Sequence, residues 1–286
     1  MTAVAIIGPG RVGTALWLAL QGRHDTVAVA GGSPAGQELF RRRTGVPVSP
    51  DPLPPCRAAT WVFLTVPDRV VAALADDLAA AGAFHAGQVV AHTAGALPSS
   101  VLAPAQAHGA EVLALHPMQS FAEPGRGSDL FQGVTCSLEG TPAALQAGAE
   151  LAASLGMRPW QVRAADKPRL HAACSLASNA LVALLAVAAS TAAESGAPFA
   201  RAQAIEALLP LCRGSLENLA RVGLPGALTG PVERGDMETV RTHLDLLSGT
   251  AEDAYRALAL VAVELAREKG SLGTAESLQL QEMLRR

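Results

Sequence analysis

Three glycines near the N-terminus have a spacing that can cradle a phosphate group. They follow the apolar run 4–7 and precede a helical pattern over 14–20. The turn reads Gly8-Pro9-Gly10-Arg11-Val12-Gly13. The first glycine permits the turn, the second lets a pyrophosphate approach, and the third lets the helix pack on the strand. Because the helix start offers free N–H groups to phosphates, residues 8–13 predict a dinucleotide site.

Further candidate side chains stand where predicted strands end. Ligands of open α/β sheets bind beyond the carboxyl ends of the strands. We therefore expect Val66, Pro67, His92 and Thr93 to contact the cofactor. His116, which a following proline fixes, is a candidate proton donor or substrate ligand. A structural role explains His116 equally well, since it could simply cap the end of its strand.

A polar stripe opens the predicted long helix over 168–194. Lys167, His171 and Ser178 fall within roughly 40° of one another at about 100° per residue, and Asn179 lies at the edge of the stripe. Polar side chains on an apolar helix must face a cleft or find buried partners. A lysine beside a dinucleotide can protonate an alkoxide. Spacing alone slightly favours the alternative, a surface lysine with a serine and an asparagine satisfied in the core.

The end of the second predicted strand bears on the choice between NAD and NADP. NAD enzymes usually carry an acid there to bind the ribose 2′-OH, but residues 30–33 are Ala-Gly-Gly-Ser. We therefore expect NADP, with NAD as the alternative. Ser33 is the candidate ligand of the 2′-phosphate, with the arginines of 41–43 nearby. A solvated helix face explains those arginines at least as well.

The loop over 228–236 is the last candidate. Arg234 has the chemistry to clamp a carboxylate. Asp236 is better explained as the N-cap of the helix that follows.

Strand and helix patterns alternate in the first half, which predicts a mostly parallel, doubly wound sheet with helices on both faces. Residues 47–55 are rich in proline and predict a loop. From residue 168 onward we find only helical patterns, including one over 198–222. The sequence thus predicts an α/β domain over 1–163 and an all-α domain over 164–286.

Composition excludes several classes of function. The chain has 286 residues, of which 50% are hydrophobic and 16% are charged, with a net charge of −3. This net charge lacks the excess of basic residues that is typical of nucleic-acid-binding proteins. Four widely spaced cysteines lack metal-site spacing, so we expect no metal and reduced thiols. Without a recognisable signal peptide, we expect a cytoplasmic protein. The apolar stretch 180–193 is shorter than a membrane span, and predicts a helix buried in a core or a dimer interface.

Several segments together resemble a known family. They are GPGRVG (8–13), TVPD (65–68), HTAG (92–95), HPMQSF (116–121), the helix start 167–179 and LTGPVERGD (228–236). In this order they resemble bacterial Rossmann-like proteins with a C-terminal domain of unknown function. That family is related to pyrroline-5-carboxylate reductase, the deazaflavin-dependent NADP oxidoreductases and the 6-phosphogluconate dehydrogenase superfamily. Some members are described as an alternative ketopantoate reductase.

The resemblance implies a Rossmann domain, a helical C-terminal domain like that of 6-phosphogluconate dehydrogenase, and a homodimer formed through its helices. It also implies that Lys167 is an acid/base residue and that Asn179 serves the same site. His171 and Ser178 match the family pattern too. This chain departs from the pattern in two places: Pro168 follows the lysine, and no basic residue follows the second strand.

We therefore expect an NADP-dependent reductase of a small keto acid or imine, with ketopantoate as one candidate substrate. Lys167 would donate the proton, and His116, Asn179 and Arg234 would hold the substrate. The alternative is a non-catalytic sensor or interaction protein that binds a dinucleotide without turnover.

Overall fold

A computed structural model describes residues 3–24, 26–122, 129–194 and 200–285. By its internal contacts the chain divides into two units, Met1–Leu176 and Ala177–Arg286. The boundary predicted between residues 163 and 164 falls inside the first unit, shortly before helix α7 (Lys167–Ser175). The limits 1–163 and 164–286 stay a prediction.

Strands of the first unit form one mixed sheet. Within the described residues it has seven strands, in the order β2-β1-β3-β4-β5-β6-β7. The strands are β1 (Ala3–Ile7), β2 (Thr26–Ala30), β3 (Trp61–Leu64), β4 (Val89–His92), β5 (Glu111–Pro117), β6 (Thr135–Gly140) and β7 (Arg158–Gln161). Neighbouring strands are parallel except for the pair β5–β6. The predicted mostly parallel sheet is confirmed, and its order reverses at β1 and β3, where such sheets bind ligands.

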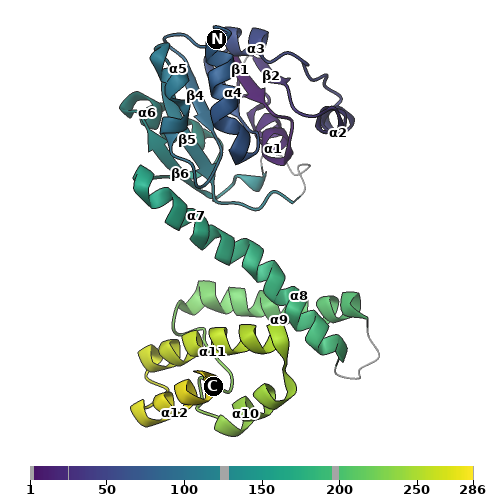
Figure 1. Cartoon of the computed structure of the whole chain (residues 1–286), viewed down its shortest axis with the longest axis vertical. Helices are drawn as coiled ribbons and strands as arrows, with labels where there is room; N and C mark the ends of the chain where they lie inside the picture. Colours follow the sequence, from purple (N-terminus) through teal and green to yellow (C-terminus); the bar gives the residue numbers. More distant parts are fainter. Residues whose placement is uncertain (1–2, 25, 123–128, 195–199, 286) are drawn as a thin grey trace. The chain divides into compact units, whose positions relative to one another are not determined.

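Helices cover both faces of this sheet (Figure 1). They are α1 (Arg11–Leu20), α2 (Pro34–Thr44), α3 (Leu53–Ala58), α4 (Asp68–Ala80), α5 (Ala103–Ala107) and α6 (Pro142–Ser154), with 3₁₀ turns η1 (Ser99–Leu102) and η3 (Ala164–Asp166). Side chains of α1 and α6 pack against one face. Those of α3, α4 and α5 pack against the other. The doubly wound arrangement is therefore confirmed.

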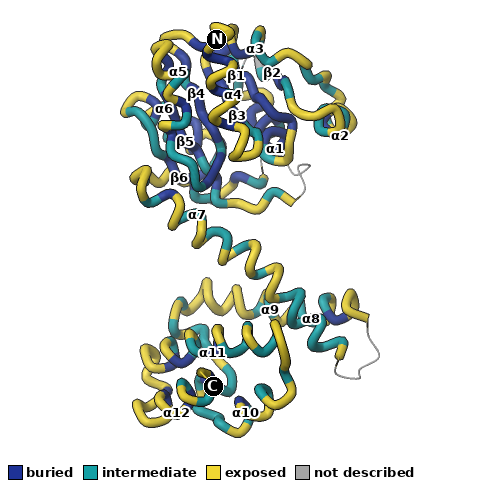
Figure 2. Tube along the Cα trace, in the orientation of Figure 1, coloured by how far each residue is buried: buried dark blue, intermediate teal, exposed yellow. Residues whose placement is uncertain are grey.

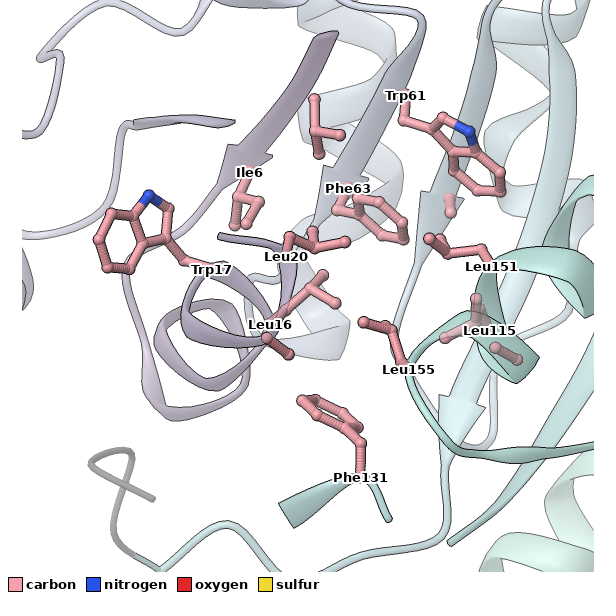
Figure 3. Close-up of a cluster of buried hydrophobic side chains, with 14 of the residues drawn as sticks. Ile6, Leu16, Trp17, Leu20, Trp61, Phe63, Leu115, Phe131, Leu151 and Leu155 are labelled. Atoms are coloured by element: carbon pink, nitrogen blue, oxygen red, sulfur yellow. The ribbon is translucent and has the colours of Figure 1, made fainter. Parts of the chain in front are cut away.

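Strand β1 shows why both faces need cover. Val4 and Ile6 point to the face of α1, whereas Ala5 and Ile7 point to the face of α4. Successive strand side chains alternate in direction, so a strand buried on both faces has a continuous apolar run. In Figure 3, Ile6 lies in the α1-side cluster with Leu16. This packing fixes the end of β1, from which the glycine turn begins.

One local prediction is wrong, and one strand was not predicted. The proline-rich stretch 47–55 is not entirely loop, because α3 starts at Leu53 and accommodates prolines in its first turn, where the missing N–H costs nothing. Strand β7 was not predicted, because it is exposed along its whole length and therefore lacks an apolar period. The helix predicted over 198–222 is described from Arg201 as α9; its first predicted residues lie outside the described part.

The described residues of the second unit form helices joined by loops, with no strand among them. The unit holds α8 (Leu181–Glu194), α9 (Arg201–Val222), α10 (Met237–Leu246), α11 (Gly249–Lys269) and α12 (Thr274–Arg285). The all-α fold predicted for this half is confirmed. Its core is small and lies mainly between α10, α11 and α12, with Val240, Val263 and Leu280 fully buried.

The helical stretch Ala164–Glu194 includes a π-helical segment, Leu176–Ala180, between α7 and α8. Among the described residues it is the one helix long and apolar enough to cross a membrane, judged by length and composition alone. Only 6% of its most apolar window is buried. The core of this chain therefore does not bury the helix. Of the two settings that the sequence predicted, a buried core and a dimer interface, the buried core is wrong.

Candidate functional site

A cavity of about 400 Å³ lies at the carboxyl ends of β1, β3, β4 and β5. Its walls come from four strand ends and α7, all within the first unit. The lining residues are Gly10, Arg11, Val12, Thr65, Val66, Pro67, Asp68, Thr93, Ala94, Gly95, His116, Pro117, Gln119, Phe121 and His171. The structure thus brings several of the predicted strand-end residues around one space.

Two of the three glycines are required by close packing. Gly8 has a φ of +114°, and a Cβ there would lie 2.7 Å from the carbonyl oxygen of Thr65. A Cβ on Gly13 would overlap the carbonyl oxygen of Gly8. The Thr65 hydroxyl donates a hydrogen bond of 2.7 Å to that same carbonyl. The turn is therefore locked between β1 and β3.

Gly10 has a different role. It is the N-cap of α1, and none of the described side chains caps this helix. A Cβ on Gly10 would meet only the carbonyl oxygen of Thr65, at 3.9 Å, so the space above it is open. The first N–H groups of a helix have no partner within the helix, and here those of Arg11 and Val12 belong to cavity-lining residues. This arrangement fits a pyrophosphate.

Contacts with the glycine turn and with α2 fix the loop that follows β2. Pro9 lies so close to Gly32 that a Cβ there would be 2.5 Å from the proline Cδ. Ser33 caps α2, its hydroxyl oxygen accepting a bond of 3.2 Å from the N–H of Gly36. Its hydroxyl proton remains able to donate to a phosphate.

The arginines of α2 are mostly engaged. Arg41 and Arg42 both pair with Glu38, at 2.8 and 2.7 Å. Neither is among the residues that line the cavity. For these two side chains the structure therefore favours the solvated helix face over a phosphate clamp.

His92 is a buried structural residue. Its Nδ1 accepts a bond of 3.2 Å from the N–H of Ala94, so Nε2 carries the proton that it donates to the carbonyl of Pro98, 3.1 Å away. Burial lowers its pKa to about 4, although the Pro98 bond acts in the opposite direction. The ring is fully buried and does not line the cavity. His92 thus holds the loop that presents Thr93 and does not offer its side chain to a cofactor.

His116 and His171 face the cavity as a pair. Their rings meet edge to face, with centroids 5.5 Å apart. Gly95 permits this approach, because a Cβ there would overlap His171 Nδ1 and lie 2.9 Å from His116 Nε2. Both nitrogens therefore converge on one point beside the loop that follows β4. Gly95 is a site residue that the sequence did not single out.

The environment of His116 keeps its ring neutral. Burial lowers its pKa to about 4, and the nearby Lys167 acts in the same direction. A neutral imidazole has one N–H donor and one acceptor nitrogen. His116 can therefore hydrogen-bond a carbonyl oxygen without carrying charge at neutral pH.

Lys167 is fully buried and does not line the cavity. Its Nζ has no hydrogen-bond partner among the described residues. Burial lowers its pKa, while the carboxylates of Glu139 and Asp68 act in the opposite direction. A buried lysine with a lowered pKa is a stronger acid than an exposed one, a property suited to proton donation.

Ser137 is a second residue that the sequence did not single out. It pairs with His116 across β5 and β6, so the two side chains lie on the same face of the sheet. Its hydroxyl is buried and has no hydrogen-bond partner in the described part of the chain. Only the antiparallel register of these strands places it there.

Other predicted residues belong to the second unit. Asn179 is exposed within the π-helical segment, and its assignment to the site stays a prediction. Asp236 caps α10, accepting a 3.0 Å bond from the N–H of Thr239, which confirms its predicted structural role. The role of Arg234 likewise stays a prediction.

Cysteine and metal chemistry add nothing to this cavity. The cysteines are unpaired, and burial raises the pKa of Cys56 and Cys136 to about 12, which keeps both thiols protonated. Among the described residues, no group of three His, Cys, Asp or Glu side chains is placed to hold a metal ion.

Comparisons with known structures agree with this architecture. A protein from Thermotoga maritima is 21% identical, with a TM-score of 0.69 over 93% of this chain and 99% of that chain. A protein from Bacteroides fragilis, provisionally named an NADP oxidoreductase, is 20% identical, with a TM-score of 0.70 over 93% and 97%. Pyrroline carboxylate reductase from Plasmodium falciparum, with NADP bound, is 12% identical, with a TM-score of 0.61 over 96% and 98%. At these identities the likeness shows the fold.

Family models match both halves of the sequence. Residues 1–117 match a Rossmann-like domain, and residues 134–262 match a domain of unknown function, DUF2520. No curated protein matches the sequence. The matches thus give the chain a Rossmann-like domain followed by a DUF2520 domain.

Proposed function

We propose that the chain is an NADP-dependent oxidoreductase that reduces the C=O or C=N group of a small keto acid or imine. The observation that carries this proposal is the cavity itself, which joins the open glycine turn to the His116–His171 pair. One part fits a dinucleotide pyrophosphate, and the other presents polar groups to a small substrate. The folds of the Bacteroides and Plasmodium proteins support the same class of reaction.

The cofactor proposal depends on the turn and on the end of β2. Gly10 leaves room for a pyrophosphate, and the start of α1 supplies N–H donors. The end of β2 has no acid for a ribose 2′-OH, and Ser33 is its candidate ligand for a 2′-phosphate. These features support NADP as the preferred cofactor and leave NAD as the alternative. A bound nicotinamide would supply the hydride.

Four residues are proposed to carry out the remaining steps of the reduction. The reacting carbon receives a hydride and its oxygen or nitrogen receives a proton, which gives an alcohol or an amine. His116 is neutral, so it can give its N–H proton only if its other nitrogen takes one up. Lys167, whose pKa is lowered by burial, is the proposed source of that proton. His171 would hold the substrate beside Gly95, and Asn179 is proposed to complete the site.

The direct test is NADPH oxidation with a panel of 2-keto acids, including ketopantoate, and of cyclic imines. We expect turnover with at least one of them, and a fall of about 100-fold or more in kcat for Lys167→Met. NADPH affinity should change little, because Lys167 does not line the cavity. Dinucleotide binding without turnover of any substrate would favour a sensor, and no dinucleotide binding would exclude both functions.

We also propose that the helical unit forms a homodimer. An apolar groove of about 650 Å³ runs between α8 and α11, with Leu184, Val187 and Leu258 among its walls. Val182 on α8 is 69% exposed. Exposed apolar patches of this kind mark protein interfaces, and a two-fold dimer covers the same patch on both copies.

A further inference from the structure

The loop between β4 and η1 forms one wall of the cavity, and Gly95 is part of that wall. Gly95 is packed so closely against the rings of His116 and His171 that it has no room for a Cβ. No backbone–backbone hydrogen bond holds residues 93–97 to the rest of the described chain. Side-chain contacts must therefore fix this wall, and with it the place of the two rings.

His92 holds the loop at two points. Its Nδ1 accepts a bond of 3.2 Å from the N–H of Ala94, and its Nε2 donates a bond of 3.1 Å to the carbonyl of Pro98. These bonds tie together the two ends of the stretch that carries Gly95. A shift of Gly95 relative to β4 therefore has to break or lengthen one of them.

Glu139 on β6 holds the next residue of the chain. Its two carboxylate oxygens accept bonds of 2.6 and 2.8 Å from the N–H and the hydroxyl of Ser99, which begins η1. Hydrogen bonds to a charged group are stronger than those between neutral groups. Because Ser99 directly follows Pro98, the carboxylate anchors the carbonyl to which His92 donates.

The strand register explains how Glu139 reaches this loop. His92 pairs with Ala114 across β4 and β5, and Ala114 pairs with Glu139 across β5 and β6. Paired side chains point to the same face of a sheet, so these three form a row. The middle side chain is only a methyl group, which leaves room above it for η1, and η1 contacts all three strands.

We propose that Glu139 and Ser99 are positioning residues of the candidate site. They act through His92 on the loop that keeps the rings of His116 and His171 in place. This rests on the proposed function, in which that pair of rings meets the substrate. Neither Glu139 nor Ser99 lines the cavity, so we assign them no contact with the substrate.

Glu139→Ala in the full chain removes both bonds to Ser99. The imidazole NMR signals of His116 and His171 should shift, and substitution can assign them because the chain has seven histidines. In the reductase assay kcat should fall at least about tenfold, because a small misplacement of site groups is costly. NADPH affinity should change less than about twofold, because the glycine turn and Ser33 keep their own contacts.

Glu111→Ala is the matched control. The Glu111 carboxylate also accepts a hydrogen bond from a hydroxyl, that of Thr141, but it begins β5, whereas His116 lies near the other end of that strand. Tm should fall in both variants, since each loses a bonded carboxylate. The ring signals and kcat should change only in Glu139→Ala. Equal changes in the two variants would reflect lost stability alone and would overturn the proposal.

Glu139→Gln separates position from charge. A glutamine can accept the N–H of Ser99 and donate to its hydroxyl oxygen, so both bonds are kept without the charge. We expect both ring signals near their original positions and kcat within about threefold of the original value. A loss as large as in Glu139→Ala would show that the carboxylate acts through its charge on Lys167, and would overturn the proposal.

His92→Asn and His92→Leu test the next contact without depending on the folding of Glu139→Ala. An asparagine side chain can accept a bond from the N–H two residues on, so only His92→Asn keeps the bond to Ala94. The ring signals should therefore shift less in His92→Asn than in His92→Leu. Shifts of equal size would break the proposed link between Ser99 and the rings.

The NMR signals also distinguish this proposal from the proposed function, because they need no turnover. Shifted ring signals in a Glu139→Ala chain whose original form reduces no substrate would support the positioning contacts and remove the reductase. Unshifted ring signals in Glu139→Ala would overturn the positioning role, whatever the chain reduces.

Discussion

The two units differ in how completely they bury their apolar side chains. The sheet of the first unit is covered on both faces, and its central strands β1, β3, β4 and β5 are buried along most of their length (Figure 2). In the second unit, one cluster is centred on α11, while α9 is mostly exposed and most of α8 is only partly buried. The first unit thus closes its core within one chain, whereas the second presents a surface that needs cover.

This difference separates two kinds of residue. In the glycine turn and the cavity, close contacts within the chain fix the positions of the glycines and of the site side chains. On α8 the apolar side chains are mostly only partly buried within the chain, so we expect part of their role to lie in association. Substitutions in the first unit should therefore change folding or the site, and those on α8 should change assembly.

The largest effect is expected at Gly13. In Gly13→Ala the new Cβ would overlap the carbonyl oxygen of Gly8 and lie 2.7 Å from the Thr65 hydroxyl. Because backbone and a bonded hydroxyl cannot move cheaply, we expect the free energy of unfolding to fall by about 3 kcal/mol. Urea denaturation measures it.

Gly10→Ala is the matched control, since its Cβ meets nothing closer than 3.9 Å. Stability should change by less than about 1 kcal/mol, while NADPH affinity falls at least about tenfold, because the methyl group occupies the space of the pyrophosphate. Equal stability of the two variants would show that the turn is not locked as the structure indicates.

The second prediction concerns Gly95. In Gly95→Ala the methyl group would displace the rings of His116 and His171, so we expect kcat/KM to fall about 100-fold in the reductase assay. Stability should fall by about 1–3 kcal/mol. Gly214→Ala on α9, where a Cβ meets nothing within 4 Å, should leave kcat/KM unchanged. Full activity in Gly95→Ala would remove the histidine pair from the site.

The first unit was well predicted because its signals are local. The second predicted strand, whose end was placed at residues 30–33, is observed as β2, and the glycine spacing led directly to the cavity. Ser33, however, is an N-cap as well as a candidate ligand. β7 was missed because an exposed edge strand leaves no periodic pattern.

The site was harder to predict because it depends on distant contacts. His116 and His171 were expected and do line the cavity, but Lys167 is buried and His92 is bonded on both nitrogens. The place of Ser137 opposite His116 comes from the register of an antiparallel pair, which one sequence does not reveal. The strand register determines which side chains are buried together. It therefore also determines which buried polar groups have no hydrogen-bond partner in the described part of the chain.

Acid should weaken the first unit through its buried histidines. Burial lowers the pKa of His92 from 6.5 to about 4, so the folded state binds fewer protons than the unfolded state between these values. The stabilisation is present above pH 6.5 and is lost as pH falls toward 4. Because one pKa unit corresponds to about 1.4 kcal/mol, we expect a loss of about 3 kcal/mol over this interval.

Urea denaturation at several pH values measures this slope. His92→Gln should be less stable at pH 7 and show a shallower fall below pH 6.5, because a titrating group is gone. His108→Gln, at an exposed position on the same unit, should keep the slope of the original protein. An unchanged slope in His92→Gln would contradict the burial of a neutral ring.

The smallest expected effect concerns the second unit and its exposed apolar helix α8. Val182→Glu places a charge on the exposed apolar face of α8 and should weaken the proposed dimer at least about tenfold. Sedimentation at several protein concentrations measures the dissociation constant. Folding should be unaffected, because the side chain is 69% exposed.

Leu39→Glu on α2 is the control, because Leu39 is also exposed but belongs to the first unit. It should leave the dissociation constant unchanged. Weakening by both variants would mean that the dimer does not depend on α8 in particular. A chain that stays monomeric at micromolar concentrations would show that its apolar face is not covered by a second copy, and that the exposed helix must serve a different partner.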